Sequence, residues 1–278
     1  MVQKKPKLLF TIGDPNGVGP EIILKIFQDL NSNDKYNLKI TGAKTILDSY
    51  SSLLNLPEIS RQKIIEIPLP KKFKLTPGKI DKAAGKISGD AIKLATELCM
   101  KKEFDALITM PVSKEALNVG GYDYPGHTEM LTKLTKSNDT VMILYSEEFS
   151  VGLITGHIPL KEVSKQLNKK LIFSKTITVN NSLVKDFKII KPKIALLSLN
   201  PHAGDGGLIG NEEIKFIKPV IEEMNSMGFN VRGPFSSDAY FANKSYKKFD
   251  MTIAMYHDQG LIPFKMISFG RGVNFTAG

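Results

Sequence analysis

Short apolar runs alternate with amphipathic, helix-like stretches along most of this chain of 278 residues. Residues 8–12 form an apolar run typical of a buried strand, and residues 20–30 place apolar side chains at helical spacing. Further strands are predicted at 38–41, 63–67, 105–110, 140–145, 150–155, 193–199, 230–232 and 250–256, and further helices at 43–54, 161–186 and 211–227. This order of strands and helices predicts an α/β protein.

Loop-like segments interrupt the pattern at two places. Residues 68–85 are rich in proline, lysine and glycine, so we expect a surface loop there, followed by a helix that Ser88 caps. Glycines and aromatic residues at 120–126 predict a crossover. The sequence therefore indicates two lobes joined near this point.

Charge and composition exclude several classes of function. The net charge is +10, but only three of the 38 basic residues are arginines and the lysines are spread along the chain, so nucleic-acid binding is not favoured. No apolar run approaches the roughly 18 residues that a membrane-spanning helix needs. The single cysteine, Cys99, excludes an intrachain disulfide and a cysteine-rich zinc site, and it favours a cytoplasmic protein.

Three of the four histidines each follow a separate strand-like run. They are His157, His202 and His257, whereas His127 lies in a glycine-containing loop. Ligands of open α/β sheets bind beyond the carboxyl ends of the strands, so three imidazoles meeting there could hold a divalent metal. Isolated loop histidines are more often ordinary polar residues, and the long spacing leaves that alternative open.

Carboxylates and cations lie close to these histidines in the sequence. Asp258 directly follows His257, and Asp238 follows two serines; either could orient an imidazole or transfer a proton, and a helix cap or a turn is the alternative. The glycine-rich segment 264–274 contains Lys265 and Asn274 and could bind an anion, although a bulged hairpin would also explain it.

Seven ordered motifs closely resemble the 4-hydroxythreonine-4-phosphate dehydrogenase family of pyridoxal phosphate (vitamin B6) biosynthesis. The resemblance runs along essentially the whole chain, which makes it specific. The motifs are Gly13–Glu21, Met110–Lys114, Gly126–Glu129, Asn200–Gly207, Gly233–Asp238, Tyr256–Gly260 and Phe269–Asn274.

The resemblance implies a fold and a reaction. The family has two α/β/α lobes around an active cleft, as in isocitrate and isopropylmalate dehydrogenases, and works as a homodimer. It oxidises 4-phosphooxy-L-threonine with NAD or NADP to 2-amino-3-oxo-4-phosphooxybutanoate, which decarboxylates to 3-amino-2-oxopropyl phosphate. On this basis we expect residues 1–122 and 270–278 to form the first lobe. Residues 123–269 would form the second, carrying the metal and substrate residues.

The resemblance also implies a set of site residues. The family's metal site draws ligands from both subunits, and the ion is zinc, magnesium or cobalt. The metal ligands match His157, His202 and His257, and the substrate-binding residues match His127, Thr128, Lys265 and Asn274. For proton transfer or ligand orientation our own candidates are Asp238 and Asp258, with Lys114 as a third.

The family continues beyond the position of Gly278, with a segment that carries another substrate arginine and part of the nucleotide-binding loop. Three alternatives to the implied reaction stay open. The chain could be a sibling dehydrogenase of another phosphorylated hydroxy acid, such as an erythronate phosphate. It could be a zinc hydrolase, or a truncated dimer that binds metal and phosphate without turnover.

Overall fold

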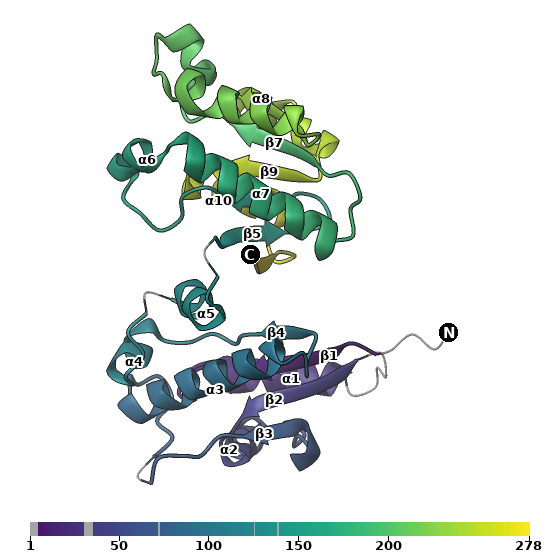
Figure 1. Ribbon diagram of the computed structural model, residues 1–278. Helices are drawn as coiled ribbons and strands as arrows, with labels where there is room; N and C mark the ends of the chain where they lie inside the picture. The colour runs from purple at the N-terminus through teal and green to yellow at the C-terminus, as the bar shows by residue number, and fades with distance from the viewer. Residues whose placement is uncertain (1–4, 31–35, 72, 125, 138) are drawn as a thin grey trace. The chain divides into compact units, whose positions relative to one another are not determined.

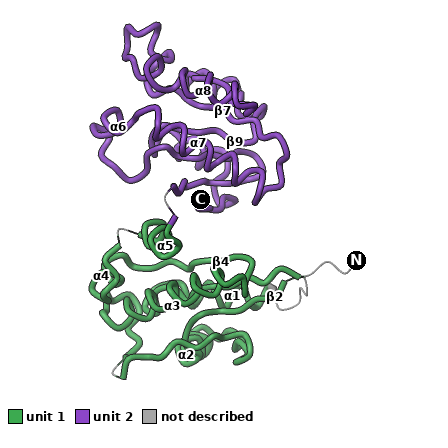
Figure 2. The backbone as a smooth tube through the Cα atoms, in the orientation of Figure 1, with its two compact units in different colours: residues 1–136 green, residues 137–278 purple. Residues whose placement is uncertain are grey.

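A computed structural model describes residues 5–30, 36–71, 73–124, 126–137 and 139–278. The chain divides into two compact units, Met1–Lys136 and Ser137–Gly278, which Figure 2 colours separately. Among the described residues, no helix combines the length and apolarity needed to cross a membrane.

The first unit contains a parallel four-stranded sheet in the order β3-β2-β1-β4. Its strands are β1 (Lys7–Thr11), β2 (Asn37–Gly42), β3 (Ile64–Glu66) and β4 (Ala106–Ile108). Its helices are α1 (Gly19–Leu30), α2 (Lys44–Leu54), α3 (Lys82–Met100), α4 (Lys114–Val119) and α5 (His127–Thr135), with a short 3₁₀ turn, η1, at Arg61–Lys63.

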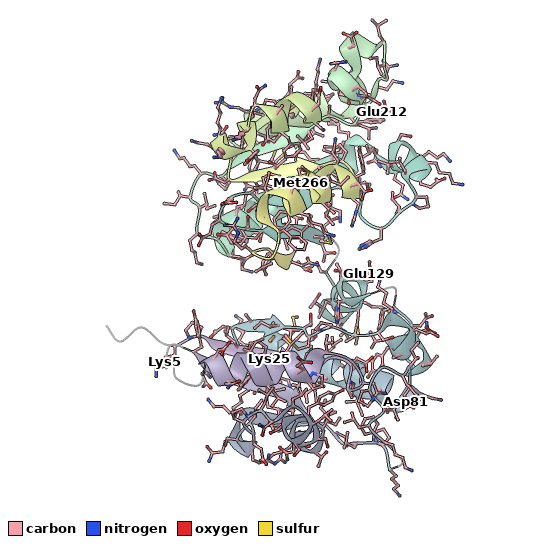
Figure 3. The ribbon with its side chains drawn as sticks, turned by 180° about the vertical axis from the view of Figure 1, so that it is seen from behind. Lys5, Lys25, Asp81, Glu129, Glu212 and Met266 are labelled. Carbon is pink, nitrogen blue, oxygen red and sulfur yellow. The ribbon has the colours of Figure 1, made fainter. Side chains whose placement is uncertain are left out.

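Helices cover both faces of this first sheet. The ring of Phe10 packs edge-on against Phe27 of α1, with the ring centroids 5.9 Å apart. The Thr41 hydroxyl donates a hydrogen bond of 3.1 Å to the Ala91 carbonyl of α3. Because residues 10 and 11 pair with residues 40 and 41 in register, Phe10 and Thr41 point to opposite faces. Figures 1 and 3 view the chain from opposite sides. Figure 1 accordingly shows α3 in front of the sheet, and Figure 3 shows α1 in front of it.

The α3 helix begins earlier than predicted. Asp81 is its N-cap, with the side chain accepting a hydrogen bond from the Ala84 N–H, so the predicted loop over 68–85 is too long. Ser88 is buried and does not cap a helix; its hydroxyl contacts the carbonyl oxygens of Gly13 and Ala84, each at 2.9 Å. The carboxylate at position 81 outcompetes Ser88 as a cap because it lies about two helical turns earlier on the same apolar pattern.

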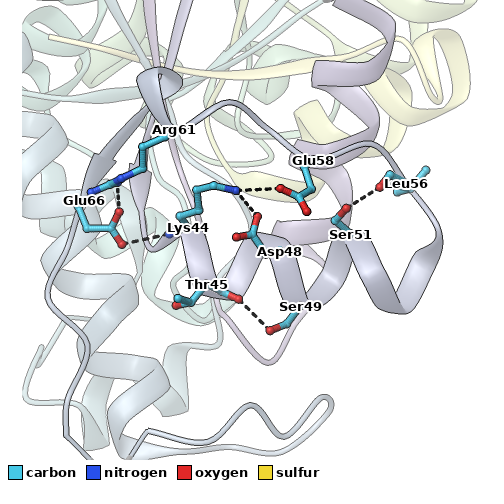
Figure 4. Close-up of polar contacts among 9 residues, drawn as sticks. All are labelled: Lys44, Thr45, Asp48, Ser49, Ser51, Leu56, Glu58, Arg61 and Glu66. Atoms are coloured by element: carbon cyan, nitrogen blue, oxygen red, sulfur yellow. Dashed lines mark hydrogen bonds and ion pairs between the residues drawn. The ribbon is translucent and has the colours of Figure 1, made fainter.

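A cluster of charged residues ties α2 to the segment that follows it (Figure 4). The Lys44 ammonium contacts Asp48 at 2.5 Å and Glu58 at 3.2 Å, and Asp48 raises the pKa of Lys44. The Glu66 carboxylate accepts a hydrogen bond of 3.1 Å from the Lys44 backbone N–H and also pairs with Arg61. Glu66 therefore caps a helix whose own N-cap residue, an alanine, cannot.

The second unit contains a mixed six-stranded sheet in the order β10-β5-β6-β9-β7-β8. Its strands are β5 (Val141–Tyr145), β6 (Val151–Leu153), β7 (Lys193–Leu197), β8 (Asn230–Phe235), β9 (Met251–Ala254) and β10 (Val273–Ala277). The strands β6, β9, β7 and β8 are parallel neighbours, whereas β5 and β10 run antiparallel at one edge. Its helices are α6 (Leu160–Gln166), α7 (Lys169–Lys185), α8 (Lys218–Ser226), α9 (Ser237–Ala242) and α10 (His257–Ser268), with short turns η2 (Pro201–Gly207), η3 (Glu213–Ile217) and η4 (Ser245–Lys248).

Two apolar clusters sandwich this second sheet. One joins alternate strand residues to Val179 of α7 and Val220 of α8, and the other joins the opposite strand residues to Leu261 and Phe264 of α10. Figure 1 accordingly shows α7 in front of the sheet. Figure 3, which gives the opposite view, shows α10 in front of it. The α/β class is confirmed, with a three-layer arrangement in this unit.

The chain divides at other points than we expected. The boundary lies between residues 136 and 137, and the segment 270–278, expected in the first lobe, supplies β10, which pairs with β5 in the second unit. The predicted helix over 161–186 is two helices, because Leu167 is extended and Asn168 caps α7. The segment predicted as an anion-binding loop begins within α10, whose apolar face is buried.

Candidate active site

Four neighbouring parallel strands of the second unit end at the same edge of the sheet. His157 follows β6, His257 follows β9, His202 follows β7 and Asp238 follows β8. The structure therefore brings the loops that carry three candidate histidines and one candidate carboxylate to one edge, where ligands of α/β sheets bind.

His157 and His257 lie side by side at this edge. Their ring centroids are 5.3 Å apart, and both side chains line a pocket of about 270 Å³. Asp258 contacts His257, with its Oδ1 atom 2.7 Å from His257 Nδ1. Because Asp258 engages Nδ1, His257 presents its Nε2 atom as a potential ligand.

His202 lines a second pocket, of about 370 Å³, together with Asp238. Tyr256 lines both this pocket and the one beside the His157–His257 pair, so the two are neighbours. Within the part of the chain that the structure describes, no three His, Cys, Asp or Glu side chains gather closely enough to hold a metal ion. One chain thus pairs two of the candidate ligands and places the third in the adjoining pocket.

Asp238 is an exposed carboxylate at the start of α9. The Ser236 hydroxyl donates a hydrogen bond of 2.6 Å to it and, with the Ala239 N–H, lowers the pKa of Asp238 below its usual range. His202 lowers this pKa further, which agrees with their shared pocket. Asp238 is therefore ionised at neutral pH.

The buried side chain of Gln259 links the ends of three strands. Its Oε1 atom accepts a hydrogen bond of 2.7 Å from the Met255 N–H, after β9. Its Nε2 atom donates to the Ser198 carbonyl, after β7, at 2.5 Å and to the Ser237 hydroxyl, after β8, at 2.9 Å. We did not single out Gln259 from the sequence, although it lies within the motif Tyr256–Gly260.

The predicted anion-binding residues lie on α10 and β10. Lys265 is exposed in the last turn of α10, and Asn274 is an exposed residue of β10 that pairs with Leu144. Arg271 forms an ion pair with Glu148 at 3.2 Å. Lys265 and Asn274 thus belong to the same unit as the three histidines.

The remaining candidates gather in the first unit. His127 and Thr128 begin α5, and Lys114 begins α4; a Cβ atom at Gly126 would lie 3.9 Å from the Lys114 ammonium. His127 Nε2 is buried without a hydrogen-bond partner, and burial lowers the pKa of His127. A buried, unpaired imidazole nitrogen next to an ammonium suits an anionic ligand with hydroxyl groups.

Comparisons with known proteins show which family the chain resembles along its length. A family model described as "Pyridoxal phosphate biosynthetic protein PdxA" matches residues 23–278. A 4-hydroxythreonine-4-phosphate dehydrogenase from Sulfurihydrogenibium is 40% identical over 98% of this chain and 86% of its own length. A D-threonate 4-phosphate dehydrogenase from Pectobacterium atrosepticum is 37% identical over 96% of this chain and 86% of its own length.

A solved structure is similar over the same extent. The crystal structure of 4-hydroxythreonine-4-phosphate dehydrogenase from Klebsiella pneumoniae has a TM-score of 0.88 and 34% sequence identity. The match covers all of this chain and 88% of that one.

Proposed function

Because the chain belongs to the PdxA family of phosphorylated hydroxy-acid dehydrogenases, we propose that it oxidises 4-phosphooxy-L-threonine with NAD or NADP. The family membership confirms the resemblance drawn from the seven motifs. The product, 2-amino-3-oxo-4-phosphooxybutanoate, would then lose carbon dioxide to give 3-amino-2-oxopropyl phosphate. Relatives named for D-threonate 4-phosphate are 35–37% identical to this chain, so that substrate is the second candidate.

The His157–His257 pair carries the catalytic part of this proposal, because it fits a divalent metal. Two imidazoles bound to one tetrahedral zinc ion have ring centres roughly 5 Å apart, given Zn–N distances of about 2.0–2.1 Å. The observed separation of 5.3 Å agrees with that value. We propose that His157, His202 and His257 hold zinc, magnesium or cobalt, with ligands from both chains of a homodimer. When bound, such an ion lowers the pKa of a substrate hydroxyl and polarises a ketone.

The two carboxylates at this edge have different roles in the proposal. Asp258 contacts His257 Nδ1 and would orient that ring. Asp238 is exposed and ionised, so it would accept the proton of the substrate hydroxyl as hydride leaves for the nicotinamide. Lys114 is the alternative proton-transfer group, in the first unit.

Substrate binding would use the charged and polar residues outside the metal set. Lys265 and Asn274 would bind the phosphate, and His127 and Thr128 would bind the rest of the substrate. Holding the phosphate away from the reacting carbon orients that carbon without changing its chemistry.

An exposed apolar stripe supports the homodimer. Ile262, Met266 and Phe269 follow one another at helical spacing along and just beyond α10, and they are 57, 82 and 81% exposed. Figure 3 shows Met266 on the outer side of this helix. The stripe borders the pocket lined by Asp238 and Asp258. We propose that a second copy covers it and thereby brings the two active sites next to the interface.

One assay tests the proposed reaction. The chain, loaded with Zn²⁺, Mg²⁺ or Co²⁺, would be mixed with NAD or NADP and with 4-phosphooxy-L-threonine, D-threonate 4-phosphate or erythronate 4-phosphate. We expect nicotinamide reduction with the first substrate at the highest kcat/KM. Faster reduction with another substrate would reassign the chain to a sibling activity, and phosphate or ester hydrolysis without nicotinamide would refute the dehydrogenase.

A further inference from the structure

We infer that Glu213 is a positioning residue whose buried carboxyl group holds the segment carrying His202 and so fixes where the His202 imidazole lies. This inference rests on the proposed function for its catalytic meaning, because His202 is there a metal ligand. Its structural content concerns only the second unit of the chain.

The segment that carries His202 has an unusual backbone. Residues 202–206 all have left-handed φ angles, at 51, 53, 80, 43 and 66°. Two of these residues are glycines, but His202, Ala203 and Asp205 carry a Cβ atom that disfavours this conformation. Such a run persists only where the surrounding contacts determine it, and such backbone is common at functional sites.

Glu213 supplies contacts just before this segment. It is fully buried, at 0% exposure, as the first residue of η3. Its Oε1 atom accepts hydrogen bonds from the backbone N–H groups of Leu199 and Asn200, both at 2.8 Å. Its Oε2 atom accepts a third bond, of 3.0 Å, from the Asn200 side-chain amide. The two residues that lead into Pro201 and His202 are therefore fixed by one carboxyl group.

The same carboxyl group also lies close to the middle of the segment, at Gly204. A Cβ atom at Gly204 would lie 2.7 Å from Glu213 Oε2 and 3.0 Å from the Gly210 carbonyl oxygen. The left-handed segment thus packs closely against Glu213 at Gly204, while hydrogen bonds to Glu213 fix the backbone before His202. A wide turn of η3, in which the Lys218 N–H bonds to the Glu213 carbonyl, places this side chain under the loop.

The chemistry of the site requires a carboxyl group and not merely a side chain of this size. All three groups that contact it are N–H donors, and an ionised carboxylate offers only acceptors. Glutamine at this position would point its own amide N–H₂ at a donor in either orientation of the amide. In one orientation it would face the Leu199 and Asn200 backbone N–H groups, and in the other it would face the Asn200 side-chain amide. Glu213→Gln should therefore release the loop while conserving the volume of the side chain.

The test uses the four histidines of the chain as reporters. The full chain would be labelled with ¹³C at the imidazole Cε1 position, and the His202 signal assigned with His202→Asn. In Glu213→Gln we expect the His202 signal to shift or broaden, while the His127 signal stays unchanged. The control is Glu222→Gln, which removes the same charge from an exposed position of α8 and should leave all four signals in place.

Two further measurements separate the possible outcomes. Co²⁺ titration of the same variants should show binding weakened about 10–100-fold in Glu213→Gln. An unmoved His202 signal in folded Glu213→Gln would overturn the inference. A moved signal together with normal Co²⁺ binding by His202→Asn would support the positioning role and refute the proposed metal role. If Glu213→Gln does not fold, Asn200→Ala removes the side-chain bonds to Glu212 and Glu213, and an unmoved His202 signal there would also overturn the inference.

Discussion

Replacing Gln259 with leucine should destabilise the second unit, because this side chain joins three strand ends. The substitution keeps the side chain close to its original size but removes all three hydrogen bonds. It leaves two deeply buried backbone groups without a partner, since Met255 is 0% and Ser198 1% exposed. The Ser237 hydroxyl is more accessible, so water can replace its bond.

The expected magnitude follows from those two buried groups. A buried donor or acceptor left unpaired costs roughly 1–3 kcal/mol, so the pair costs about 2–6 kcal/mol. Leucine recovers part of this through apolar burial, and single substitutions rarely exceed about 4–5 kcal/mol. We expect the free energy of unfolding to fall by roughly 3 kcal/mol, with a Tm lower by about 5–10 °C.

Urea denaturation followed by circular dichroism measures this loss. Gln166→Leu is the matched control, because Gln166 is exposed at the end of α6 and the chemical change is the same. We expect the control to stay within about 0.5 kcal/mol of the parent protein. A Gln259→Leu variant as stable as the control would show that Gln259 does not hold the strand ends together.

Three other predictions address different parts of the molecule. Burial lowers the pKa of His127 below 6.5, so the unfolded chain binds the proton more readily and stability should fall as the pH drops below about 6.5. The free energy of unfolding of His127→Gln, measured by urea denaturation, should differ less between pH 7.5 and 5.5 than that of the parent protein. A variant with the same pH dependence as the parent would show that His127 does not cause it. Gly85→Ala would place a Cβ atom 1.7 Å from the Ala116 carbonyl oxygen, so we expect a loss of about 3 kcal/mol, and a parent-like urea midpoint would contradict the close packing of α3 on α4. Asp258→Asn should weaken Co²⁺ binding by about 10-fold, because the charge that holds His257 is lost. Calorimetric titration measures the Co²⁺ affinity, and an unchanged affinity would show that Asp258 does not support the metal site.

Much of the fold and of the candidate site could be predicted from local sequence. The spacing of apolar residues predicted strands such as 8–12 and 193–199, because burial on one face repeats with the period of the element. The position of His157, His202 and His257 after strands predicted one sheet edge, since parallel strands end together. The ordered motifs predicted the family.

Burial of polar side chains could not be predicted in the same way. Glu213 and Gln259 are residue types that usually lie on the protein surface. Only tertiary packing buries these two side chains and brings backbone N–H and C=O groups into contact with them. The pairing of β10 with β5 likewise depends on residues more than a hundred positions apart.

The sequence by itself determined where most of the strands form, which family the chain belongs to, and that histidines follow three strands. Tertiary structure alone decided which of those histidines are neighbours. His202 lies between the other two in the sequence, yet β9 lies between β6 and β7 in the sheet, so His157 meets His257 across a hundred residues. Local periodicity encodes which face of an element is buried, but strand order is chosen by the packing of all elements together.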